Sequence, residues 1–201
     1  MTRTASALVL TLLVSCLALA QAPAPTQRIR GEVVSVDGPN LKVKERSGEL
    51  LVIKLAENYV VTGVVKVGIE AITPNAFVGT ASMPQSDGTQ TALEVLVFPE
   101  SGRGSGEGHY PWDLQPGSMM TNATVADVVA VGPARRMTLR YKDGEKVIVV
   151  PASAPIVTFE PGDRAMLKAG AHVLLTATRQ PDGSLTAARV AAGKDGLVPP
   201  M

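Results

Sequence analysis

Short runs of alternating hydrophobic and polar residues cover most of the chain. In the run LKVKE, Leu41 and Val43 fall on one face of an extended strand, and Lys42 and Lys44 fall on the other. Similar runs rich in β-branched residues follow, with turn residues such as Gly, Asp and Asn between them; they are RGEVVSVDG, ELLVIKLA, NAFVGTASM and TQTALEVLVF. This pattern predicts an all-β protein made of short strands, in which an alternating strand has one buried and one exposed face.

One hairpin is marked clearly by its turn. Asp87-Gly88 lies between NAFVGTASM and TQTALEVLVF, and Asp-Gly is typical of a tight β-turn. The stretch from Glu57 to Asn75 is less regular, and we expect one helical turn near Ile69 to Ile72.

The second half of the chain repeats the pattern of the first at an offset of about 95 residues. The hairpin turn and the Thr-Ala pair that follows it stay in phase, which indicates duplication of a unit with five strands. The matching positions are Val52-Ile53 with Val147-Ile148, Val78 with Val173, Asp87-Gly88 with Asp182-Gly183, Thr91-Ala92 with Thr186-Ala187, and Val95 with Val190.

Five strands with an irregular connection after the third are typical of a small OB-like barrel, and closure of the sheet removes exposed strand edges. The sequence therefore predicts two tandem small OB-like five-stranded barrels, at residues 30–99 and 124–192. We expect an ordered irregular linker, packed as a belt across the barrels, at residues 100–123, and a frayed tail at residues 193–201.

Two short motifs carry a family resemblance. The opening G-x-V-x-x-V-D-G (Gly31 to Gly38) and the hairpin D-G-x-x-T-A (residues 87–92 and 182–187) resemble uncharacterised exported bacterial proteins built of small OB-like repeats. The resemblance covers residues 30–97 and 125–191. Some members are labelled as metal-transporter permeases, so the resemblance implies a metal-related context, and it brings no catalytic or binding residues.

The first twenty residues have the features of a signal peptide. Arg3 provides the positive start, residues 5–19 are apolar, and Ala18-Leu19-Ala20 fits a cleavage site, so residues 1–20 predict export to the periplasm. Residues 21–29 are then expected to form a Pro/Ala tether. No later stretch is apolar over enough residues to predict a transmembrane span.

A lipid anchor is the alternative. Leu13-Val14-Ser15-Cys16 fits a bacterial lipobox, in which Cys16 would be acylated and would attach the protein to the envelope membrane. Cys16 is also the only cysteine, so an internal disulfide and a thiolate metal site are both excluded.

Charge and motif content exclude several functions. Without Arg3, the 19 Lys and Arg become 18, which equals the 18 Asp and Glu, and only 3% of residues are aromatic. This composition argues against nucleic acid as a partner. The sequence has neither a G-x-S-x-G nucleophile motif nor a phosphate-binding loop, so we predict that the protein is not an enzyme.

The central segment contains the candidate site residues. His109, Met119 and Met120 offer imidazole and thioether donors, which suit a copper-type ion, and Met83 or His172 could complete such a site. The alternative is that the methionines fill gaps in the packing and that no cofactor binds.

Tyr110, Trp112 and Asp113 are the candidate contacts to a ligand or partner, because ordered loops with aromatic residues often carry function. The leading hypothesis is a non-enzymatic, exported binding protein that contacts an envelope protein or a small ligand. The alternative is a periplasmic carrier of a soft metal, using His109, Met119 and Met120.

Overall fold

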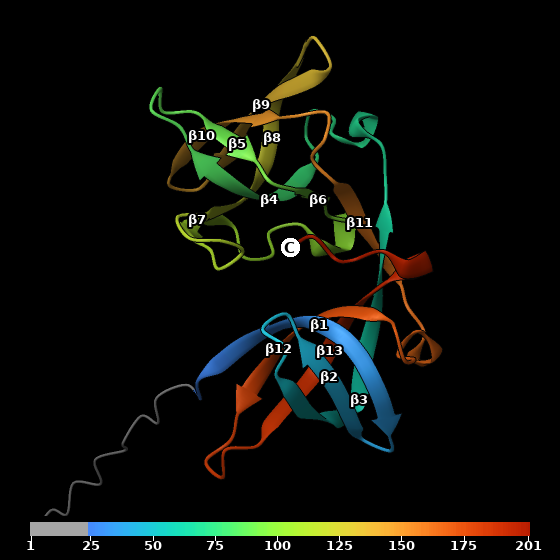
Figure 1. The fold of residues 1–201 in the computed structure, drawn as a ribbon. Helices are drawn as coiled ribbons and strands as arrows, with labels where there is room; N and C mark the ends of the chain where they lie inside the picture. Colours follow the sequence, from blue (N-terminus) through green and yellow to red (C-terminus); the bar gives the residue numbers. More distant parts are fainter. Residues whose placement is uncertain (1–23) are drawn as a thin grey trace, which may run out of the picture.

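The computed structural model describes residues 24–201, and the expected signal peptide at residues 1–20 and the lipidation site Cys16 lie outside this part. The described residues form thirteen β-strands and four single-turn 3-10 helices, which confirms the all-β prediction. All thirteen strands belong to one continuous sheet. Figure 1 shows the strands gathered in two groups, one above the other.

The first group is a closed five-stranded barrel. Its strands pair in the order β1-β2-β3-β13-β12, and β12 returns to β1. All neighbours are antiparallel except β3 and β13, which are parallel. The strands are β1 (Thr26–Asp37), β2 (Asn40–Glu45), β3 (Leu50–Lys66), β12 (His172–Arg179) and β13 (Leu185–Gly193).

The second group of five strands pairs in the same manner. The order is β8-β9-β10-β5-β4, β4 also pairs with β8, and the parallel neighbours are β10 and β5. The strands are β4 (Phe77–Pro84), β5 (Gln90–Ala92), β8 (Met119–Val131), β9 (Ala134–Tyr141) and β10 (Gly144–Val150).

Each group takes strands from both halves of the chain. In Figure 1 the orange-red β12 and β13 lie beside the blue and teal strands β1 to β3, and the green β4 and β5 lie with β8 to β10. The structure therefore does not confirm the expected arrangement of one tandem barrel in residues 30–99 and another in 124–192. What is confirmed is a closed five-stranded barrel with further strands.

The long strand β3 connects the two groups. Its first part pairs with β2 inside the first barrel, and its last residues pair with β11 (Ile156–Pro161), where Val64 lies opposite Phe159. Strand β11 also pairs in parallel with β6 (Val95–Val97). A small cluster of buried residues, which includes Leu96 and Val157, packs at this crossing.

The predicted alternation of hydrophobic and polar residues determines which side chains form the two main cores. In β2, Leu41 and Val43 are fully buried inside the first barrel, whereas Lys44 is exposed. In the second group, Met137 and Leu139 of β9 alternate in the same way and pack against the strands around them. The expected turns also form, since Asp87-Gly88 closes the β4–β5 hairpin and Ile69–Ala71 is a 3-10 helix.

Four expectations from the sequence are wrong in the described residues. Residues 57–66, expected to be less regular, continue strand β3 to Lys66. Residues 26–29, assigned to the tether, belong to β1 because Ile29 is buried in the first barrel. The segment expected to be irregular contains β7 (Gly108–Pro111) and the start of β8, which pair with each other. The tail is not frayed, because Met201 packs against the cluster at the crossing.

Each group takes strands from both halves of the chain, so neither half carries a complete set of strands for either group. We predict that fragments 24–98 and 99–201, expressed separately, are not folded monomers, and that an equimolar mixture regains the β-sheet signal of the intact chain. Circular dichroism and analytical ultracentrifugation measure this. A folded monomer of either fragment alone would show that one half can close its own sheet, and would contradict the dependence of each half on the other.

Candidate functional site

A cavity of about 880 Å³ lies between the first barrel and the second group. One wall comes from β1, β3, β12 and β13, and the other from β4, β6, β8 and the segment of residues 98–112. Apolar side chains such as Leu96, Phe98, Phe159 and Leu174 line much of it. Arg189, which is exposed to solvent, also lies on the wall, so the cavity opens at the protein surface.

Glu94 is a fully buried carboxyl on this wall. Its Oε1 accepts a hydrogen bond from the backbone N–H of Ala81 at 2.7 Å, whereas Oε2 has no partner among the described residues. Burial raises the pKa of Glu94 to about 8, although the Ala81 amide and the charge of Arg30 act in the opposite direction. Near neutral pH the carboxyl therefore keeps its proton.

The indole Nε1 of Trp112 is a second buried polar atom that has no partner within residues 24–201. The backbone around it is fixed: its N–H donates to the carbonyl of Ser118 at 2.8 Å, and the Ser118 hydroxyl donates back to the Trp112 carbonyl at 3.0 Å. The guanidinium of Arg28 lies over the ring, 3.7 Å from its centroid. The Trp112 ring is thus held in place by both the loop and the cation.

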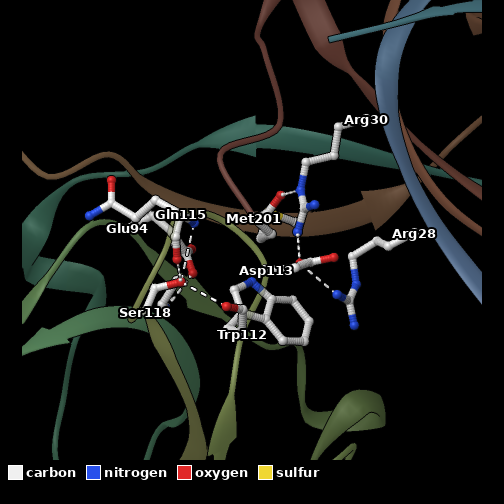
Figure 2. A network of polar contacts seen from close by, with 9 residues as sticks. Arg28, Arg30, Glu94, Trp112, Asp113, Gln115, Ser118 and Met201 are labelled. Atoms are coloured by element: carbon white, nitrogen blue, oxygen red, sulfur yellow. Dashed lines mark hydrogen bonds and ion pairs between the residues drawn. The ribbon is translucent and has the colours of Figure 1, made fainter. Parts of the chain in front are cut away.

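Asp113 lies between two arginines, as Figure 2 shows. One of its carboxylate oxygens is 2.6 Å from Arg28 and 2.7 Å from Arg30, and Arg30 also donates from Nε to the main-chain oxygen of Met201. Partial burial raises the pKa of Asp113, but the hydrogen bonds and charges of the two arginines outweigh this and lower it below its usual value. This ion-pair network fixes Arg28 at the edge of the cavity.

Arg189 differs from Arg28 in its environment. It forms no ion pair with any residue in 24–201, and it lies on the same cavity wall as Arg28. The ionisable side chains on the wall, within the described residues, are thus two guanidinium groups and the buried carboxyl of Glu94.

The structure does not bring the three predicted metal donors together. His109 lies opposite Thr121 in the β7–β8 pair, whereas Met120 points to the other face of that pair and lines the cavity. Met119 lies on the same face as Thr121, so it also points away from Met120. In residues 24–201 no group of three or more His, Cys, Asp or Glu side chains is placed to hold a metal ion.

His109 has hydrogen-bonding neighbours on both ring nitrogens. Nδ1 is 2.9 Å from the Thr121 hydroxyl, and Nε2 is 3.4 Å from the amide nitrogen of Gln90. Burial, together with the charge of Lys146, lowers the pKa of His109. These contacts account for the position of the ring.

Of the predicted ligand contacts, Trp112 lines the cavity and Asp113 orients Arg28 beside it. Tyr110 does not line it, but its hydroxyl accepts from the Asn122 side chain at 3.2 Å, and Asn122 is on the wall. The sequence reasoning missed Glu94. The signal was a single acidic residue inside the apolar run ALEVLVF, where burial of a charged side chain is unusual.

No protein-family model, curated protein or solved structure matches the chain. The resemblance to exported OB-like repeat proteins therefore stays a prediction. In the described part of the chain, no helix is both long enough and apolar enough to cross a bilayer.

The raised pKa of Glu94 predicts a specific dependence of stability on pH. The folded state holds a proton on Glu94 up to about pH 8, whereas the unfolded state loses it near the ordinary glutamate pKa of 4.5. Stability from this group is therefore full below pH 4.5 and is lost as the pH rises to about 8, by up to about 1.4 kcal/mol per pH unit.

We expect the Glu94→Gln variant to lose this dependence, because glutamine keeps an oxygen for the Ala81 amide and cannot ionise. Urea unfolding at pH 5.5 and 8.5 measures it, and the variant should gain stability relative to the native chain only at the higher pH. Glu49→Gln, at an exposed position, is the control. Equal pH dependence of the native chain and the Glu94 variant would contradict the assignment.

Proposed function

We propose that this protein is a non-enzymatic, exported binding protein of the bacterial envelope, and that it binds a small ligand in the cavity between the two groups of strands. The observation that carries the proposal is the cavity itself, which combines a largely apolar lining with a few polar side chains, among them Arg28, Glu94 and Arg189.

The size and chemistry of the cavity support this function. Small-molecule sites are mostly apolar, have volumes of about 300 to 1,000 Å³, and carry a few polar groups that orient the ligand. The cavity has about 880 Å³ and such a lining. Polar side chains on the wall, such as Arg28 and Arg189, can form hydrogen bonds that fix the orientation of a ligand.

We also infer that the chain is a duplicated pair of OB-like barrels that exchange their last two strands. Gly88 and Gly183 close equivalent hairpins with φ of 82° and 84°, and each follows an aspartate (Asp87, Asp182) that accepts two hydrogen bonds from the residue two positions later. The parallel pairs Ile53–Leu185 and Ile148–Gln90 are likewise related by 95 residues, since 148 − 53 and 185 − 90 both equal 95. On this view the ligand cavity is the seam between the two barrels.

The uncharged fluorescent dye N-phenyl-1-naphthylamine tests the proposed function. We expect saturable one-to-one binding, with energy transfer from Trp112, which is the only tryptophan in the chain. The Ala188→Phe variant places a large side chain on the cavity wall and should weaken binding by about tenfold or more.

Ala169→Phe is the matched control, because Ala169 is exposed and does not line the cavity. Binding that is absent in the native chain, or that both variants reduce equally, would remove the cavity as the ligand site.

A further inference from the structure

We propose that the cavity is selective for an amphipathic anion, and that its ligand class is a carboxylate attached to an acyl chain. This inference rests on the proposed function, since it names the ligand of the same site. It depends on three features of the cavity: the charge on its wall, the type of hydrogen-bonding groups it offers, and the shape of its apolar part.

The charge on the wall is positive. Of the described ionisable side chains that line the cavity, Arg28 and Arg189 are cations, and Glu94 is the one acidic group. Glu94 is completely buried, and desolvation keeps its carboxyl neutral near pH 7. A cationic ligand would therefore meet two guanidinium groups and a neutral Glu94 side chain, whereas an anion would meet Arg189, which has no ion pair among residues 24–201.

Three side chains on the cavity wall can only donate hydrogen bonds. They are the guanidinium groups of Arg28 and Arg189 and the indole of Trp112. Arg28 adds N–H groups, since Nη1 is the atom that pairs with Asp113. A carboxylate carries two oxygens that only accept hydrogen bonds, so it complements these donors better than an alcohol or an amine does.

Arg28 is held in position before any ligand arrives. Its guanidinium stacks on the Trp112 ring at 3.7 Å and is tied to Asp113 at 2.6 Å. Asp113 is in turn held by Arg30, whose side chain is mostly buried. A fixed cation loses little conformational freedom when it pairs with a ligand, so this network favours binding of an anion.

The remaining wall suits a flexible apolar body. Leu96, Phe98, Phe159 and Leu174 belong to different strands and to the segment after β6, and they meet at the crossing of β3 and β11. Phe98 and Phe159 pack edge to face, with ring centroids 6.0 Å apart. Each methylene that an acyl chain buries there contributes about 0.8 kcal/mol, so affinity should rise about tenfold for every two carbons added.

The decisive experiment compares three ligands that share a twelve-carbon chain: dodecanoate, 1-dodecanol and dodecylamine. Titration is followed by Trp112 fluorescence and by calorimetry at pH 6.5, below the critical micelle concentrations. We expect dodecanoate to bind at least about tenfold more tightly than dodecanol, and dodecylamine to bind most weakly.

Each other result has a distinct meaning. Equal binding of dodecanol and dodecanoate would overturn the selectivity for an anion and leave the proposed function intact. Tightest binding of dodecylamine would overturn it as well, with Glu94 acting as a counter-ion. If none of the three ligands, nor the naphthylamine dye, binds to the native chain, the proposed function itself fails.

A pair of matched variants tests the role of charge without touching the Arg28 network. Arg189→Gln should weaken dodecanoate binding about fivefold or more and change dodecanol binding less than twofold. Arg136→Gln removes an exposed arginine that does not line the cavity, and it should change neither. Equal loss in both variants would show a long-range effect of net charge, and would overturn the assignment of Arg189 to the site.

Discussion

The antiparallel pairing of β3 with β11 is the contact on which the rest of the structure depends. At this point Val64 and Phe159 lie opposite each other, and the two strands carry the chain in opposite directions between the groups. Gly162 shows how tight the crossing is, because a Cβ there would lie 2.8 Å from the backbone nitrogen of Gly63. Strand β3 leads to the β4–β5 hairpin, which joins the group of β8 to β10. Strand β11 leads to the β12–β13 hairpin, which joins the group of β1 to β3.

The cavity is a consequence of this crossing. Two closed or nearly closed sets of strands cannot merge their cores, because each already buries its own apolar face. Between the two sets of strands, only a small cluster that includes Val64, Leu96 and Val157 is buried from solvent. The segment from Phe98 to Trp112 and the last residue, Met201, border the remaining space and do not fill it. The cavity, which has both apolar and polar side chains in its lining, thus lies between the two cores and does not interrupt the packing of either one.

The sequence predicts much of the local structure and little of the long-range pairing. Alternation in LKVKE correctly gives the buried positions Leu41 and Val43, and Asp87-Gly88 gives the β4–β5 hairpin. These features depend on neighbours in the chain. Whether β4 pairs with β1 of its own half or with β8 of the other half changes neither the hydrophobic pattern nor the turn, so the pattern cannot distinguish the two arrangements.

The candidate site was predictable in part for the same reason. Trp112 stood out because it is the only tryptophan and lies in an unusual segment. Glu94 lies between β5 and β6 and Arg189 lies in β13, so they come from opposite halves of the chain, and local patterns in the sequence do not place them on one cavity. The metal hypothesis was built on proximity in sequence, but in β8 adjacent residues point to opposite faces, which separates Met119 from Met120.

Because strands from both halves of the chain pair in each group, the two halves of the gene also depend on each other. A substitution in β12 alters the barrel that contains β1, and a substitution in β4 alters the group that contains β8. Neither half of the chain can be lost or replaced on its own without removing strands from both groups. Selection therefore acts on the pair as a single heritable unit, even though the chain reads as two similar segments.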